Sequence, residues 1–220
     1  MSRVVEFTSC VVYLPATYLP TRSYSIIYAL HGYNGQGSDF FTKSLMKGYL
    51  DKSIKSRIFP SSIIVCINAR NSWYLEPLES LFIKHFIPMF EHSFVCRCKS
   101  RSILGISMGG YGALYYSLKY PRLFQSVFAI SPAIRPKPNQ HVPSILTLLR
   151  LLQHIPQSQV GSVFVLCGKQ DSRVKDINSL VQMIKQKDLN MSILLTPGKH
   201  DWDYFNSAIR IICYDYGSFI

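Results

Sequence analysis

A serine flanked by two glycines is the feature that most constrains the fold of this chain. Gly105, Ser107 and Gly109 stand between a predicted strand that includes Arg101 and the predicted helix Tyr111–Tyr120. Where a strand turns sharply into a helix, the central residue is strained, and a Cβ two residues before or after it would clash. The bare Gly-x-Ser-x-Gly pattern also occurs at turns without chemistry. In this context it predicts that the Ser107 hydroxyl stands clear of the sheet, facing the N–H groups of the helix.

Strand-like and helix-like segments alternate through most of the chain. The predicted strands are Val4–Thr8, Cys10–Leu14, Ser25–Leu30, Ser62–Asn68, Ser126–Ser131, Ser162–Cys167 and Met191–Thr196, of which the first two are predicted to form a hairpin. The other predicted helices are Asp39–Ile58, Pro77–Phe94, Val174–Gln186 and Tyr204–Tyr214. Continuous apolar runs are typical of strands buried on both faces of a parallel sheet. We therefore expect one α/β domain over residues 1–220, with a mainly parallel sheet and helices on both faces.

The segment 132–159 breaks this alternation. It starts rich in proline, is basic, and contains one apolar helical piece, Ile145–Leu152. Two interpretations stay open: a small cap-like insertion over the site, or an ordinary connection with a helix.

Composition limits the classes of partner. Lys and Arg outnumber Asp and Glu by 24 to 12, a formal net charge of +12. Such an excess is compatible with nucleic acid, an anionic membrane or an acidic substrate, but the basic residues are scattered, so no nucleic-acid partner is expected. Charges, Pro or Gly interrupt every apolar run well short of about 18 residues, so no membrane span is expected. The N-terminus does not resemble a signal peptide.

The cysteines favour a reducing compartment. Cys96 and Cys98, with His92 close by, lack the paired spacing of a zinc site, so neither a metal nor another cofactor is expected. Four further cysteines lie in apolar runs, where they are interpreted as reduced core residues: Cys10, Cys66, Cys167 and Cys213. We expect a cytoplasmic protein.

A serine hydroxyl is a weak nucleophile and needs an adjacent base that an acid orients. Asp171 and His200 each follow a predicted strand, so both fall at the strand ends on the same edge as Ser107, in the order Ser, Asp, His. The alternative is that each is a solvated turn residue. The competing residues lie before Ser107, in the segment 132–159 or at helix ends: His85, His92, His141, His154, Asp176, Asp188, Asp201 and Asp203.

Attack by Ser107 would create an oxyanion that preorganised N–H groups must stabilise. One donor is expected to be the Met108 amide at the helix start. The other is expected to be the Tyr33 amide in the loop His31-Gly32-Tyr33, where Gly32 permits close approach and His31 braces the loop.

Five motifs carry a resemblance to a known family: His31-Gly32, Asn71–Tyr74, Gly105–Ala113, Gly168–Asp171 and Gly198–Trp202. Together, from about Val11 to Ile212, they resemble the esterase D-like esterases of the α/β-hydrolase fold. That family includes S-formylglutathione hydrolases, feruloyl esterases and tributyrin-type short-chain esterases. The resemblance implies a metal-free serine carboxylesterase with the triad Ser107, Asp171 and His200 and the oxyanion donors Tyr33 and Met108.

The chain also departs from the family pattern. The acidic residue that the family pattern places soon after Ser72-Trp73-Tyr74 is displaced or replaced, and Leu75-Glu76 follows instead. The segment 132–159 has no recognisable counterpart in the family. Tyr111 stands where glutathione-thioester hydrolases tend to carry His, which favours the short-chain esterases. Trp73 and Trp202 are candidates for the substrate pocket.

These observations lead to a hypothesis and two alternatives. The hypothesis is a serine carboxylesterase that hydrolyses small carboxylic esters through an acyl-enzyme. One alternative is a thioesterase of the S-formylglutathione hydrolase type, and the other is a non-catalytic hydrolase-fold binding protein with a basic surface. A homo-oligomer is compatible with the sequence.

Overall fold

The computed structural model describes residues 1–94, 97–136, 142–145, 161–187 and 191–220, and within them eight strands form one sheet. In chain order they are β1 (Arg3–Glu6), β2 (Cys10–Leu14), β3 (Tyr24–Leu30), β4 (Ser62–Ile67), β5 (Cys98–Ile106), β6 (Ser126–Ile130), β7 (Ser162–Gly168) and β8 (Met191–Thr196). Their order in the sheet is β1-β2-β4-β3-β5-β6-β7-β8. β2 pairs antiparallel with β1 and β4, and every other pairing is parallel. The predicted hairpin and the mainly parallel sheet are confirmed.

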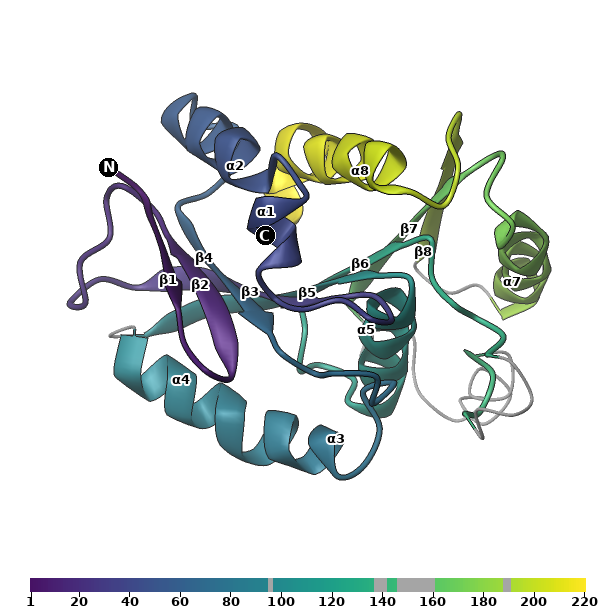
Figure 1. Cartoon of the computed structure of the whole chain (residues 1–220), viewed down its shortest axis with the longest axis horizontal. Coiled ribbons are helices and arrows are strands. Elements are labelled where there is room, and N and C mark those ends of the chain that lie inside the picture. The colour runs from purple at the N-terminus through teal and green to yellow at the C-terminus, as the bar shows by residue number, and fades with distance from the viewer. Residues whose placement is uncertain (95–96, 137–141, 146–160, 188–190) are drawn as a thin grey trace.

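Helices cover both faces of the sheet (Figure 1). On one face lie α1 (Asp39–Thr42), α2 (Met46–Lys55) and α8 (Trp202–Asp215), followed by a 3₁₀ turn, Gly217–Phe219. On the other lie α3 (Leu78–Ser80), a π-helical segment (Leu81–Phe86), α4 (Ile87–Phe94), α5 (Met108–Lys119) and α7 (Val174–Lys187). A hydrophobic core lies on each face of the sheet, and successive side chains of β3 point into opposite cores. Tyr28 belongs to the core under α4 and α5, and Ile27 belongs to the core under α2 and α8. This is the predicted α/β-hydrolase architecture.

The continuous helix predicted over Asp39–Ile58 is wrong, because α1 and α2 are separate helices. Ser44 makes the break: its hydroxyl donates to the Phe40 carbonyl at 2.8 Å and accepts the Met46 N–H at 3.0 Å. The N–H of Leu45, between Ser44 and Met46, donates to Asn206 Oδ1 on α8 at 2.8 Å. Local side-chain bonds and a tertiary bond thus replace the helical hydrogen bonds at this point.

Other helices also differ in detail from the prediction. The helix predicted over Pro77–Phe94 contains the π-helical segment. α8 begins at Trp202, before the predicted Tyr204, because the Asp201 carboxylate accepts the Tyr204 N–H at 3.0 Å as an N-cap.

The possible cap, residues 132–159, lies mostly outside the described residues, which include only 132–136 and 142–145 of it. The choice between a cap and a connection therefore stays open. No helix in the described part of the chain has the length and apolarity that a membrane crossing requires.

The register of the parallel strands brings their carboxyl ends to one edge. Leu30 pairs with Gly105, Ile106 with Ile130, and Gly168 with Thr196. The loops that follow β3, β5, β7 and β8 therefore meet at this edge, where ligands bind in open α/β sheets.

Candidate active site

Ser107 occupies a strained turn between β5 and α5. Its φ of 55° and ψ of −110° are unusual for a residue with a side chain. A Cβ on Gly105 would lie 2.0 Å from the Gly109 carbonyl oxygen, and a Cβ on Gly109 would lie 1.9 Å from the Leu30 carbonyl oxygen. The Ser107 N–H donates to the Ile130 carbonyl at 2.9 Å. The two glycines and this bond hold the turn that the sequence predicts.

A chain of hydrogen bonds connects Ser107, His200 and Asp171. Nε2 of His200 lies 3.0 Å from Ser107 Oγ, and Nδ1 lies 2.8 Å from Asp171 Oδ2. Since a carboxylate only accepts, Nδ1 carries the proton and Nε2 is free to accept the Ser107 proton. Ser107 and Asp171 are buried, whereas His200 is partly exposed. The arrangement is able to convert a serine hydroxyl into a nucleophile.

The Asp171 carboxylate is held at both oxygens. Oδ1 accepts the backbone N–H of Arg173 at 2.8 Å, while Oδ2 accepts from His200. Burial acts to raise the pKa of Asp171, but these hydrogen bonds outweigh it and hold the pKa below its ordinary value. Asp171 is therefore ionised at neutral pH.

The loops that carry Asp171 and His200 are bound to each other. Gln170 Oε1 accepts the Gly198 N–H at 2.7 Å, and the Gln170 N–H donates to the Gly198 carbonyl at 3.0 Å. The distance between carboxylate and imidazole thus depends on two adjacent loops bound directly to each other.

The two backbone amides predicted to bind the oxyanion belong to segments that lie close to Ser107. The Met108 N–H is at the N-terminus of α5, and the loop of Tyr33 passes close to Ser107, because a Cβ on Gly32 would lie 3.5 Å from Ser107 Cβ. Within the described residues, neither amide donates a backbone hydrogen bond. Both are available to an oxyanion.

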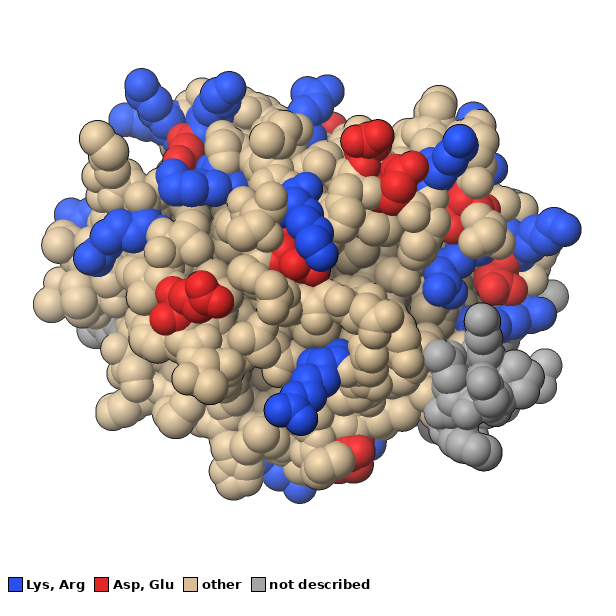
Figure 2. Space-filling view, in the orientation of Figure 1, with Lys and Arg blue, Asp and Glu red and all other residues tan. Residues whose placement is uncertain are grey.

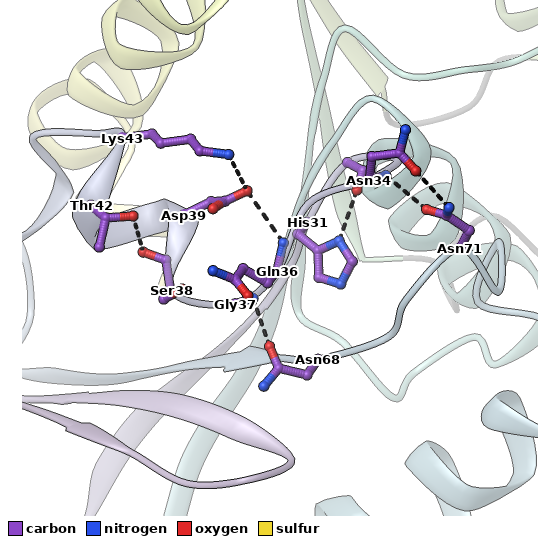
Figure 3. A network of polar contacts seen from close by, with 11 residues as sticks. His31, Asn34, Gln36, Gly37, Ser38, Asp39, Thr42, Lys43, Asn68 and Asn71 are labelled. Atoms are coloured by element: carbon purple, nitrogen blue, oxygen red, sulfur yellow. Dashed lines mark hydrogen bonds and ion pairs between the residues drawn. The ribbon is translucent and has the colours of Figure 1, made fainter.

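Polar contacts fix the loop that carries the Tyr33 amide (Figure 3). The Asn34 N–H donates to Asn71 Oδ1 at 2.7 Å, and Asn71 Nδ2 donates back to Asn34 Oδ1 at 2.7 Å. Farther along, the Gly37 N–H donates to Asn68 Oδ1 at 2.8 Å. Asp39 accepts from the Gln36 N–H at 3.2 Å and pairs with Lys43 at 3.1 Å. These contacts therefore hold the loop in place from residue 34 to residue 43.

His31 braces the start of this loop, as expected. Its Nδ1 lies 2.8 Å from the Gly32 carbonyl and so carries the proton, and its Nε2 accepts the Ala69 N–H at 3.0 Å. Burial lowers the pKa of His31, which keeps the ring neutral. The buried Tyr74 hydroxyl donates to the His31 carbonyl at 2.8 Å.

A cleft of two lobes opens at Ser107. One lobe, about 430 Å³, is lined by Tyr33, Trp73, Ser107, Met108, Arg135, Pro136, Ser172, Arg173 and Asp176. The other, about 330 Å³, is lined by Gly32, Tyr33, Asn34, Gly35, Asp39, Lys43, Ile106, Ser107, Arg173, His200, Trp202 and Phe205. Both predicted tryptophans therefore line the cleft, one in each lobe, and we call these the Trp73 lobe and the Trp202 lobe.

Known proteins resemble this chain in sequence and in fold. The chain matches the protein family described as "Putative esterase" over residues 6–212. The chain belongs to this esterase family. It is thus a hydrolase of carboxylic esters with the α/β-hydrolase fold, and the predicted resemblance is confirmed.

Individual relatives of this esterase agree with the family. It is 26% identical to an acetyl esterase of Caldicellulosiruptor saccharolyticus, over 83% of this chain and 79% of the relative. The structure resembles a ferulic acid esterase with a TM-score of 0.85, 22% identity and coverage of 100% of this chain and 98% of the other. It also resembles an S-formylglutathione hydrolase of Staphylococcus aureus, with a TM-score of 0.76, 16% identity and coverage of 97% and 94%.

Some residues of the esterase site were not singled out from the sequence. Ser172 and Arg173 line the cleft and directly follow Asp171 in the chain. Their position on the same loop as Asp171 is the sequence signal that could have indicated them. Tyr74 belongs to the motif Asn71–Tyr74, but nothing in its spacing indicates that its hydroxyl donates to the His31 carbonyl. In the described part of the esterase, no group of three or more His, Cys, Asp or Glu side chains is placed to hold a metal ion.

Proposed function

We propose that this esterase hydrolyses small carboxylic esters by transferring the acyl group to Ser107. One observation carries the proposal: His200 lies between Ser107 and Asp171 with both ring nitrogens at hydrogen-bond distance. The enzyme class implied by the family favours this reaction over the predicted alternative of a non-catalytic binding protein.

In the first half of the reaction Ser107 Oγ attacks the ester carbonyl carbon while His200 Nε2 takes the hydroxyl proton. The carbonyl oxygen becomes an oxyanion that the amides of Tyr33 and Met108 stabilise. When this intermediate collapses, the bond to the alcohol oxygen breaks and His200 returns its proton to the leaving alcohol. Asp171 stabilises the imidazolium while it exists.

In the second half a water molecule attacks the acyl-enzyme. His200 takes a proton from the water, and the same two amides stabilise the second oxyanion. The bond from the acyl carbon to Ser107 Oγ then breaks, Ser107 regains its proton from His200, and the acid leaves.

The two lobes suggest where each part of the ester binds. Because His200 must protonate the leaving alcohol, the alcohol part is assigned to the Trp202 lobe, which His200 lines. The acyl part is then assigned to the Trp73 lobe. Each lobe lies in the lower half of the range of volumes of small-molecule pockets, which supports small esters. The name of the acetyl esterase relative agrees with a short acyl group.

A burst assay tests the mechanism. p-Nitrophenyl acetate, butyrate and octanoate are mixed with wild type and with Ser107→Ala. We expect a stoichiometric burst of p-nitrophenol that Ser107→Ala lacks, and a preference for the shorter chains. Turnover that persists in Ser107→Ala would contradict the assignment of the nucleophile.

Thioester hydrolysis stays the alternative within the same chemistry. Tyr111 stands where glutathione-thioester hydrolases tend to carry His, and this difference favours oxygen esters. Its ring is buried against Trp73, and its hydroxyl donates to the Pro143 carbonyl at 2.9 Å. Comparing kcat/KM for a thioester and its oxygen counterpart separates the two, because that ratio reports transition-state binding.

The cytoplasmic location is also part of the proposal. Among the described residues Cys10, Cys66, Cys167 and Cys213 are free and buried, as expected of a protein from a reducing compartment. The oligomeric state stays a prediction that size-exclusion chromatography with light scattering would test.

A further inference from the structure

Arg173 is the cation at the junction of the two lobes. It is partly buried, and with Tyr33 and Ser107 it belongs to the lining of both. Within the described residues its guanidinium donates no hydrogen bond and forms no ion pair within 4.0 Å; the hydrogen bonds of Arg173 are made by its backbone, whose N–H donates to Asp171 Oδ1 and whose carbonyl accepts from Asp176 and Ile177. A partly buried guanidinium without a partner is unfavourable, because arginine offers five N–H donors and a fixed charge.

Two of the carboxylates of the cleft form ion pairs with other cations: Asp39 with Lys43 at 3.1 Å, and Asp176 with Arg135 at 3.6 Å. The third, Asp171, is hydrogen-bonded to the neutral His200 ring at 2.8 Å. Burial lowers the pKa of Arg173, and the attraction of Asp171 and Asp176 offsets this only in part. Among the described residues, the Arg173 guanidinium is therefore a cation of the cleft that no carboxylate contacts directly.

The sequence supplies no further carboxylate in the neighbouring segment. Residues 137–160 contain no Asp and no Glu. The acidic residue outside the described ranges, Asp188, follows the C-terminal end of α7, whereas Arg173 directly precedes its N-terminal end. The whole of α7, 14 residues and about 20 Å long, therefore lies between Arg173 and Asp188 in the chain.

The charge on Arg173 is also distinct from the general basicity of the surface. Figure 2 shows Lys and Arg side chains spread over the visible face, with Asp and Glu among them. Those exposed charges interact mainly with water and salt. A guanidinium in a cleft beside Ser107 interacts instead with what binds there.

We propose that Arg173 binds a negatively charged group of the substrate, so that this esterase prefers esters whose acid part carries a second carboxylate. This rests on the proposed function, because the acyl part is assigned to the Trp73 lobe, which Ser172 and Arg173 line. A guanidinium matches a carboxylate with two parallel hydrogen bonds. The substrate class is monoesters of short dicarboxylic acids.

The test uses matched pairs of methyl esters. The monomethyl esters of succinic, glutaric and adipic acid are compared with the corresponding methyl ester amides, which have the same size without the charge. Methanol release gives kcat/KM for each. In wild type we expect at least one charged ester to exceed its amide by about tenfold, with the excess falling as salt is added.

Variants assign this ratio to the guanidinium. In Arg173→Gln the ratio should fall toward one, and in Arg173→Lys it should be intermediate, because lysine keeps the charge but not the planar pair of donors. Lys175→Gln removes the same charge from an exposed position two residues away and should keep the wild-type ratio.

The outcomes separate this inference from the proposed function. A wild type that hydrolyses the amides at least as well as the charged esters at all three lengths would overturn the role of Arg173 and leave the esterase mechanism intact. A ratio that survives in folded Arg173→Gln would do the same. If wild type hydrolyses neither member of any pair, the proposed function and this inference both fail.

Discussion

Gly109 lies so close to the end of β3 that a Cβ at this position would be 1.9 Å from the carbonyl oxygen of Leu30. The first turn of α5 therefore packs directly on the backbone of β3. This contact places the Ser107 turn beside the loop that carries the Tyr33 amide, and it leaves no room for a side chain.

Gly109→Ala should destabilise the protein by about 3 kcal/mol, because backbone and not a flexible side chain must move. Urea unfolding measures the change. Gly48→Ala is the matched control: a Cβ there meets nothing within 4 Å in the exposed surface of α2, so it should stabilise by about 0.5–1 kcal/mol. Equal stability of Gly109→Ala and wild type would contradict the close contact.

Asp171→Asn should lower kcat by about 10⁴-fold. The side-chain amide of Asn can donate to His200 Nδ1, so the ring proton is no longer held on Nδ1 and Nε2 is no longer kept free to accept the Ser107 proton. The control is Asp201→Asn, next to His200, which keeps a good N-cap for α8 and should retain activity and stability. Steady-state kinetics on p-nitrophenyl acetate decides. Similar losses in both variants would mean that charge near His200, and not the hydrogen bond to Asp171, supports catalysis.

Asn71→Ala should lower kcat by up to about 10²-fold with little effect on the fold, because the exposed amide pair with Asn34 positions the Tyr33 N–H. Asn206→Ala removes the same kind of bond, to the Leu45 N–H, and neither Asn206 nor Leu45 is among the residues that line the two lobes. That variant should keep its kcat. A change confined to KM in Asn71→Ala would count against a role in the transition state.

Glu79 stabilises the fold in a pH-dependent way. The buried carboxylate accepts hydrogen bonds from the hydroxyls of Tyr115 and Tyr120 and pairs with Lys119. Burial acts to raise the pKa of Glu79, but these partners outweigh it and lower the pKa. A carboxyl whose pKa is lower in the folded state contributes stability above its unfolded pKa, about 4.3, and loses it as pH falls through the folded pKa.

Glu79→Gln should therefore cost about 1–3 kcal/mol at pH 7, since its amide N–H groups would face other donors, and the difference from wild type should shrink as the pH falls below about 4. Denaturant unfolding from pH 7 to pH 3 follows this difference. Glu76→Gln, an exposed neighbour, should change the free energy of unfolding by less than about 0.5 kcal/mol. If the difference in free energy of unfolding between wild type and Glu79→Gln stays constant with pH, the charge of Glu79 is not what stabilises the fold.

The sheet and the Ser107 turn follow from local sequence. Runs such as Ser25–Leu30 and Ser62–Ile67 are apolar at successive positions, and this requires burial on both faces. Gly105 and Gly109 mark the turn because steric exclusion acts on the backbone itself, independently of what packs around it. The chain order and strand-end positions of Asp171 and His200 narrowed the site to one edge of the sheet.

Tertiary structure decided what depends on atoms far apart in the chain. The helix predicted from Asp39 is broken at Ser44 with the help of a bond from the Leu45 N–H to Asn206, 161 residues away, and no local pattern indicates such a bond. Arg173 looks like one more basic residue in the sequence. Its place in the cleft and its lack of a carboxylate partner among the described residues appear only when β5, β7 and β8 bring distant loops together. Local sterics and hydrophobic periodicity thus determined the elements and the nucleophile turn, whereas long-range hydrogen bonds and charge pairing decided the substrate side of the site.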